Sequence, residues 1–179
     1  MNLQETHTAG PQAIGFDYQF YYFMYLAIEL KQGQKIGFEV KDDVHIDKHD
    51  GTTILYQTKH TIVKNTDGDL QNLTTLDVDL WKTLSNWVDF INADGKNSSF
   101  LNENSFILVT NKSDNNNDFI ATLNLFKSDN DIDKVSLKIN ELENKTKDVT
   151  LKKYLKKVSK LSKNKLKLFL KKLMIETLS

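Results

Sequence analysis

The segment from residue 36 to residue 59 constrains the fold of this chain most strongly, because it combines two β-like runs with a turn. Apolar residues keep one parity along its first half, at Ile36, Phe38, Val40, Val44 and Ile46. Residues 48–51 (KHDG) have turn composition, and residues 52–59 (TTILYQTK) are rich in β-branched and aromatic side chains. The segment therefore predicts a β-hairpin in which residues 36–46 form one continuous strand.

The elements around this hairpin indicate an α/β fold. Residues 16–31 are apolar nearly all round, which predicts a buried helix that is packed on more than one side. Apolar residues at helical spacing predict further helices over residues 80–91, 119–127 and 132–142. Two lysine-faced helices are expected after residue 150, and the second of them carries Leu166, Phe169, Leu170 and Leu173. Residues 105–111 (SFILVTN) predict another strand. The order helix, hairpin, helix, strand and helices is typical of the α/β class and not of a helical bundle.

Composition limits the class of protein. With 179 residues, of which 39% are hydrophobic, the chain is long enough for one domain with a substantial core. The absence of cysteine excludes a disulfide framework and any thiolate metal site. We expect a cytoplasmic protein without a membrane segment, because no secretory leader pattern is present and the apolar run at 16–30 is short and interrupted by polar residues.

The net charge of zero conceals a division along the chain. Residues 1–150, the expected core, carry a net charge of −9, whereas residues 151–179, expected as lysine-rich helices packed on the same domain, carry +9. Such lysines either contact phosphates or solvate an amphipathic helix, and the sequence leaves both interpretations open. The expected phosphate contacts to DNA are Lys152, Lys153, Lys156 and Lys157.

Polar residues of the predicted hairpin share faces. With regular alternation Glu39 and Asp43 share one face, and on the partner strand Gln57 and Lys59 lie on one face about 7 Å apart. Carboxylate and amide oxygens suit Mg²⁺, which typically accepts one or two carboxylates and keeps waters for a phosphate substrate. A lysine beside such a metal can stabilise charge that develops on phosphate oxygens. These four residues therefore have the chemistry required for phosphodiester hydrolysis.

The same alternation is also typical of any antiparallel hairpin with one solvent-exposed face, where cross-strand charge pairs contribute only ~0.2–1 kcal/mol each to stability. The neighbouring Asp42 has the parity of Phe38 and Val40, so a regular strand turns it to the apolar face. A bulge at residues 42–43 would exchange the roles of the two aspartates. The chemical and the purely structural interpretations of the hairpin both remain open at this point.

A set of short motifs extends beyond the hairpin. In chain order they are GFDYQ (15–19), FEVKDDV (38–44), YQTKH (56–60), LWKTLSNW (80–87) and FILVTN (106–111). Their order and spacing resemble the endonuclease domain of bacterial antiphage effectors associated with cGAS/DncV-like nucleotidyltransferases (CD-NTases). That domain is a branch of the PD-(D/E)XK restriction-endonuclease-like superfamily. The resemblance covers residues 8–175, and beyond residue 110 only the succession of helices carries it.

The resemblance assigns roles to residues of the hairpin. The metal-binding aspartate of the family falls on Asp43, with Asp42 as its neighbour, and an upstream acid falls on Glu39. The second metal ligand and the catalytic lysine fall on Gln57 and Lys59. Glutamine departs here from the commoner glutamate, and a Gln-x-Lys form is similar to the Mrr-like branch.

The resemblance also implies a fold and a function. The expected fold is a restriction-endonuclease-like core, in which an N-terminal helix, a hairpin with the site, a helix and a further strand follow one another. Gln19, on that first helix, is expected to support the site. The implied activity is cleavage of double-stranded DNA with Mg²⁺, for which Mn²⁺ can substitute, in antiphage defence. Implied partners are DNA, a sensor domain or subunit outside these residues, and further copies of the chain on activation. The alternatives are a catalytically silent nuclease fold that binds DNA or a partner protein, and a nuclease that cleaves RNA.

Overall fold

The computed structural model describes residues 10–94 and 98–178. Its helices are α1 (Gly10–Ile28), α2 (Val78–Ala93), α3 (Ser99–Glu103), α4 (Asp118–Asp129), α5 (Ile132–Lys145), α6 (Val149–Ser159) and α7 (Lys163–Lys172). Its strands are β1 (Lys35–Phe38), β2 (Val44–Asp47), β3 (Thr53–Lys59), β4 (Asn104–Thr110) and β5 (Leu173–Thr177). The α/β class predicted from the sequence is confirmed.

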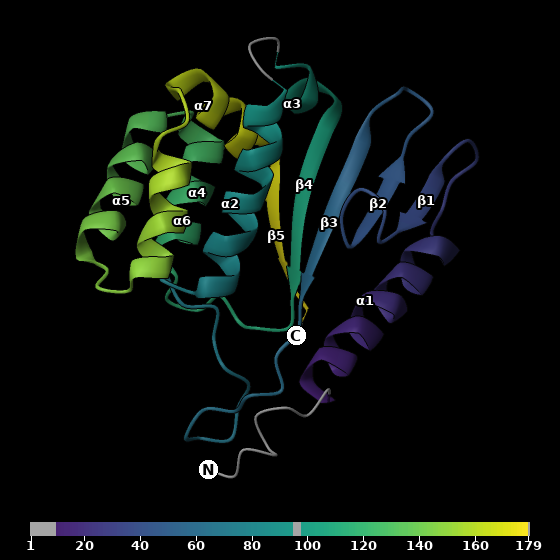
Figure 1. Cartoon of the computed structure of the whole chain (residues 1–179), viewed down its shortest axis with the longest axis horizontal. Coiled ribbons are helices and arrows are strands. Elements are labelled where there is room, and N and C mark those ends of the chain that lie inside the picture. The colour runs from purple at the N-terminus through teal and green to yellow at the C-terminus, as the bar shows by residue number, and fades with distance from the viewer. Residues whose placement is uncertain (1–9, 95–97, 179) are drawn as a thin grey trace.

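One mixed sheet organises these elements, with the strands in the order β1-β2-β3-β4-β5. The first three strands form an antiparallel meander, and β4 and β5 join it in parallel. The segment between β3 and β4 contains α2, as a parallel connection requires a crossover. In Figure 1 the sheet therefore runs from the meander on the right to β5 beside the helical layer.

Short polar side chains determine where the later helices begin. Asp77 Oδ1 accepts hydrogen bonds from the backbone N–H groups of Asp79 and Leu80 at the start of α2. The same type of cap starts α4, α5, α6 and α7, from Asn117, Asp131, Asp148 and Ser162. These caps satisfy N–H groups that a helix leaves without an internal partner.

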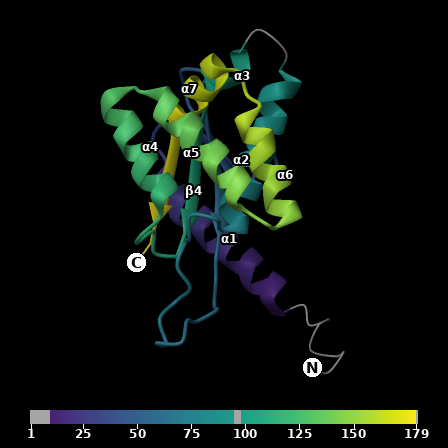
Figure 2. The same ribbon diagram turned by 90° about the vertical axis from the view of Figure 1, so that its left-hand side faces the viewer.

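The two faces of the sheet are covered unequally. Helix α1 lies on one face, and the remaining long helices lie on the other (Figures 1 and 2). The main core is formed on the face of α2, where Trp87 packs against Phe106 and Phe169 with ring centroids 5.3 and 6.4 Å apart. Residues of α6 and α7, including Leu155 and Leu170, belong to this same core.

The expectation that the first helix is buried on several sides is wrong. Only one stripe of α1, with Tyr22 and Leu26, is buried against the sheet. Its other side exposes large apolar side chains, namely Phe16, Phe20, Tyr21, Met24, Tyr25 and Ile28. The apolar composition of this helix therefore does not correspond to burial, and α1 presents an aromatic surface.

The expectation of one continuous strand over residues 36–46 is also wrong. β1 ends at Phe38 and β2 begins at Val44, and these two strands pair with each other in the register Phe38↔Val44. Residues 39–43 form the turn between them. The predicted strand is therefore a hairpin in itself, and the alternation used to assign faces stops before Glu39.

The last residues differ from the expectation as well. Leu173, expected on the final helix, instead begins β5, which pairs in parallel with β4. The short helix α3 was also not predicted. Among the residues that the structure describes, no helix is both long enough and apolar enough to cross a membrane.

Candidate active site

The turn between β1 and β2 holds the acidic residues singled out in the sequence. The backbone N–H of Glu39 donates to the carbonyl oxygen of Asp43 at 2.9 Å, which closes the turn. Glu39 has φ of 54°, a left-handed conformation that costs a non-glycine residue roughly 1–2 kcal/mol. Lys41 Nζ donates to Asp47 Oδ1 at 2.6 Å and ties the turn back to the end of β2.

Asp43 is fixed against the end of β3. Its Oδ2 accepts hydrogen bonds from the backbone N–H of Thr58 at 2.8 Å and from the Thr58 hydroxyl at 3.0 Å. Thr58 lies between Gln57 and Lys59, so this anchor holds the turn against the end of β3 that carries them, although strand alternation directs the Thr58 hydroxyl to the α1 face. Asp43 Oδ1 makes no hydrogen bond within the described residues, and it remains available to a ligand.

Asp42 points instead to α2. Its Oδ2 accepts a hydrogen bond from Trp87 Nε1 at 2.6 Å, and its Oδ1 accepts one from the backbone N–H of Asp43 at 3.0 Å. Burial raises the pKa of the Asp42 carboxyl to about 6, while the hydrogen bond from Trp87 acts in the opposite direction. Both oxygens of Asp42 are thus engaged in placing the turn against the helical layer.

Gln57 and Lys59 lie on the α2 face of the sheet by strand alternation, since Leu55 on the same strand belongs to the α2 core. Lys59 is within electrostatic reach of two acids of the turn, because it lowers the pKa values of Glu39 and Asp42. Burial and the nearby Asp43 nevertheless keep the pKa of Glu39 above its usual value. The structure therefore brings three turn acids and Lys59 into one neighbourhood.

The donor set of this neighbourhood suits a hard divalent cation. Burial first, and repulsion by Asp43 second, raise the pKa of Glu39, and a cation between the carboxylates would remove that repulsion. In the described residues no group of three or more histidine, cysteine, aspartate or glutamate side chains is placed to hold a metal ion. Mg²⁺ typically uses only one or two carboxylates, so Glu39 and Asp43 with the amide oxygen of Gln57 form a set of the appropriate kind.

Two other groups of expected site residues lie elsewhere. Gln19 belongs to α1, which packs on the other face of the sheet. The lysines of α6 do not border the hairpin, because α6 packs against α2 and α5, on the side of the helical layer that Figure 1 shows away from β1 and β2. One of them, Lys157, donates to Asp89 Oδ2 of α2 at 2.7 Å.

Sequence reasoning did not identify Thr58 or Trp87 as partners of the two aspartates. A threonine between Gln57 and Lys59 is a local signal, because its hydroxyl can bind a carboxylate of the adjacent turn. Trp87 is 45 residues from Asp42 and is otherwise a core residue, so no local pattern connects the two.

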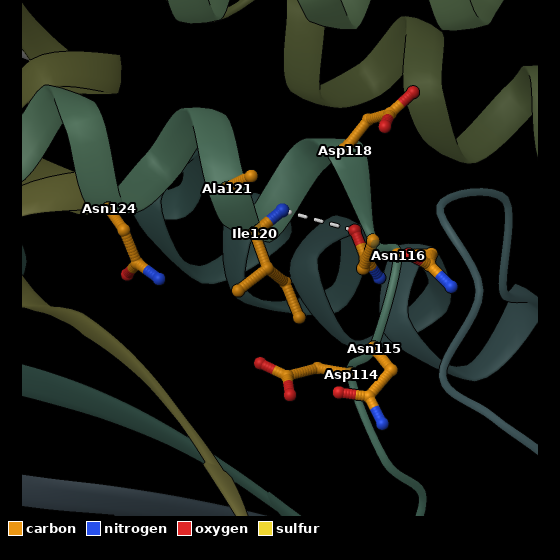
Figure 3. Close-up of a pocket in the computed structure, with 8 residues that line it drawn as sticks. Asp114, Asn115, Asn116, Asp118, Ile120, Ala121 and Asn124 are labelled. Atoms are coloured by element: carbon orange, nitrogen blue, oxygen red, sulfur yellow. Dashed lines mark hydrogen bonds between the residues drawn. The ribbon is translucent and has the colours of Figure 1, made fainter.

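The polar pocket at the start of α4 does not include the turn acids. Its volume is about 290 Å³, and it is lined by residues from Asp114 to Asn124 (Figure 3). Asn117 in this pocket is already occupied, since its Oδ1 accepts from the N–H of Ile120 and its Nδ2 donates to the carbonyl oxygens of Leu73 and Thr74. These contacts show that Asn117 caps α4 and anchors the loop before α2.

No protein-family profile, curated protein or solved structure gives a significant match to this chain. The site must therefore be interpreted from its own geometry and chemistry.

Proposed function

We propose that this chain is a metal-dependent endonuclease domain that cleaves double-stranded DNA. The observation that carries the proposal is the anchor from Asp43 to Thr58, which holds the acidic turn against the end of β3 that carries Gln57 and Lys59. The element order supports it, because an N-terminal helix, a hairpin with the site, a helix and a further strand are the parts expected for a restriction-endonuclease-like core. We assign the chain to antiphage defence on the sequence resemblance alone.

The residues of the turn take different roles in this proposal. Asp43 Oδ1, the Glu39 carboxylate and the amide oxygen of Gln57 would hold Mg²⁺ or Mn²⁺, which supplies Lewis acidity and an activated water when bound. Lys59 stabilises negative charge on the phosphate oxygens in the transition state. Asp42 acts as a positioning residue, since its two oxygens are bound to Trp87 and to the backbone of the turn.

The strained conformation of Glu39 is a second, independent support. Left-handed non-glycine residues persist where the surroundings impose them, and they concentrate at functional sites. Here the Glu39 N–H closes the turn by donating to the Asp43 carbonyl oxygen, and the Glu39 carboxyl is near enough to Lys59 for the lysine to lower its pKa. A purely structural turn would be more stable with glycine at this position.

The decisive experiment is a DNA cleavage assay with and without Mg²⁺ on the wild-type chain and on Lys59→Ala. We expect the rate of the variant to fall by about 10²–10³-fold, as for removal of one transition-state donor, with an unchanged melting temperature. The matched control is Lys35→Ala, at an exposed position of the same meander, which should cleave at the wild-type rate. Cleavage by Lys59→Ala at the wild-type rate would show that the assignment is wrong.

Metal titration separates the nuclease from a silent scaffold. Calorimetry with Mn²⁺ should show that Asp43→Asn abolishes binding, whereas Asp42→Asn retains most of it because the oxygens of Asp42 are already engaged. DNA binding without metal binding and without cleavage would favour the silent scaffold instead. Cleavage of RNA but not of DNA would keep the catalytic assignment and change the substrate.

The lysines of α6 remain proposed phosphate contacts, now placed away from the hairpin. Changing Lys152, Lys153, Lys156 and Lys157 to glutamine should weaken DNA binding, and the dependence of log K on log salt should flatten by about three to four units. An unchanged slope would mean that these side chains only solvate α6. Lys157 is expected to contribute least, because it is paired with Asp89.

A further inference from the structure

A second pocket lies on the opposite face of the sheet, between α1 and β5. Its volume is about 360 Å³, and its walls are Tyr18, Tyr21, Tyr22, Tyr25, Glu176 and Leu178. The four tyrosines follow one another at helical spacing and so form one stripe of α1. Glu176 belongs to β5 and faces α1, because its neighbour in the sheet, Val109, packs in the α1 core. We call this site the tyrosine pocket.

The walls of the tyrosine pocket attract positive charge. The faces of aromatic rings carry negative electrostatic potential and bind cations within about 6 Å of the ring centroid. Tyr22 and Tyr25 lie next to each other, with ring centroids 6.0 Å apart, and Tyr21 and Tyr25 are exposed to solvent. A carboxylate at the base of such a group of rings adds a full negative charge.

Glu176 lacks a cation of its own. Its Oε2 accepts one hydrogen bond, from the hydroxyl of Tyr22 at 3.3 Å. Although ten lysines occur in residues 151–179, in which Glu176 is the only acid, no lysine or histidine of the described residues lies within salt-bridge distance of it. The carboxylate acts on its surroundings, because burial and Glu176 together raise the pKa of Tyr56 to about 12.

A further wall residue lacks a hydrogen-bond partner. The hydroxyl of Tyr18 is buried, and within the described part of the chain it makes no hydrogen bond. Buried hydroxyl groups normally have a partner, and a phenolic oxygen can accept a bond from an N–H donor. The tyrosine pocket therefore combines aromatic faces with a carboxylate that has no cationic partner among the described residues, and one of its tyrosines has a buried hydroxyl without a hydrogen bond.

We propose that the tyrosine pocket binds a guanidinium group. Guanidinium is planar, carries five N–H donors, stacks on aromatic faces and is less strongly hydrated than an ammonium group. A volume of about 360 Å³ is at the lower end of the range for ligand pockets, which suits one arginine-sized group. The chain contains no arginine, so neither its own side chains nor those of a second copy can supply the ligand.

Calorimetric titration of the full chain tests this proposal with matched ligands. N-acetylarginine amide should bind, and N-acetylcitrulline amide, which has the same shape without the charge, should bind at least about tenfold more weakly. N-acetyllysine amide should also bind more weakly than the arginine compound. Equal binding of the arginine and citrulline compounds, or binding of neither, would overturn the proposal.

Two variants locate the binding. Glu176→Gln keeps the shape of the pocket and should weaken binding of the arginine compound at least about tenfold. Tyr25→Ala removes an exposed ring and should also weaken binding, and it provides an independent readout should Glu176→Gln unfold. Phe20→Ala is the control, since Phe20 is an exposed aromatic residue of α1 outside the pocket. Loss of affinity in Phe20→Ala equal to that in Tyr25→Ala would contradict the site.

The source of the guanidinium is distinguished by two further ligands. Free L-arginine represents a small molecule, and the peptide Gly-Arg-Gly represents an arginine side chain of another protein. Tighter binding of free arginine identifies a metabolite site, and tighter binding of the peptide identifies a protein contact. Both results support a guanidinium site, and failure of both ligands to bind would refute it.

Discussion

The two faces of the sheet differ in how they are built. On the α2 face, 27 buried hydrophobic side chains of the described residues form one cluster that joins the sheet with the later helices. On the α1 face the corresponding cluster contains six, and the single helix that covers it exposes aromatic residues to solvent. The α2 face therefore supplies most of the hydrophobic stabilisation, which scales with the apolar area buried.

This difference indicates how the molecule separates stability from recognition. The hydrogen bond from Trp87 to Asp42 attaches the acidic turn to the α2 face. The proposed catalytic residues are therefore held against the part of the fold with the larger core. The tyrosine pocket lies on the α1 face, where fewer buried apolar contacts hold the helix on the sheet. Regions with few buried apolar contacts open with the lowest free energy, so α1 should be the more mobile of the two layers.

The largest effect is expected from adjacent residues of β4 that face opposite layers. Leu108 is fully buried in the α2 cluster, whereas Ile107 is only partly buried against the α1 cluster. Within the range of ~2–5 kcal/mol for such truncations, Leu108→Ala should cost about 4–5 kcal/mol of unfolding free energy and Ile107→Ala about 2–3 kcal/mol. Urea denaturation measures both. Equal losses would remove the distinction between the faces.

A buried ion pair should give the next largest effect. Lys112 Nζ donates to Asp77 Oδ2 at 2.8 Å and to Asp79 Oδ2 at 3.1 Å, which ties the segment after β4 to the start of α2. Burial opposes the charged form of Lys112, but the two aspartates keep its pKa above the ordinary value. Asp77→Ala removes both this partner and the helix cap, so it should cost about 3–5 kcal/mol.

The comparison variant is Asp79→Ala, which removes the second carboxylate partner of Lys112 and leaves the first. The side chain of Asp79 is 48% exposed, whereas that of Asp77 is 7% exposed. Its removal should therefore cost less than about 1 kcal/mol. A loss as large as that of Asp77→Ala in chemical denaturation would show that Asp79 is the main partner of Lys112.

The smallest effect is expected on the outer side of α1. Ile28 is 80% exposed, so Ile28→Lys should change the unfolding free energy by less than about 0.5 kcal/mol. Leu26, two residues earlier on the same helix, is 8% exposed and faces the sheet, and Leu26→Ala should cost at least about 2 kcal/mol. Thermal melts of the two variants provide the comparison. A marked loss in Ile28→Lys would indicate that the exposed side of α1 is covered.

The predicted elements differ in how well local sequence determines them. The periodicity of Leu80, Leu84, Trp87, Val88 and Ile91, behind the acidic first turn, predicted α2 correctly because burial on one side imposes that spacing. The helical spacing of Leu166, Phe169, Leu170 and Leu173 predicts that Leu173 belongs to the last helix. It lies in β5 because pairing with β4 overrides local preference, and no window of the sequence contains that information.

The candidate site was predictable in its residue types and not in its geometry. Glu39, Asp43 and Lys59 were selected on the assumption of a regular strand, and the structure brings them together through a turn instead. The turn was not recognised because Glu39 occupies a left-handed conformation that sequence patterns normally reserve for glycine or asparagine. The burial of one stripe of α1 and the exposure of the other likewise depend on which elements cover the face, and composition alone does not determine it.

The hydrogen bond between Tyr22 and Glu176 joins residues separated by 154 positions, and this separation has a consequence for synthesis on the ribosome. Strand β5 supplies Glu176, so this contact of the α1 face cannot form until residues 173–177 have left the ribosome. At typical elongation rates of 5–20 residues per second, about 8–30 s pass between the synthesis of Tyr22 and that of Glu176. During that interval the tyrosine side of α1 lacks its partner on β5, so this side adds apolar surface that a chaperone can bind.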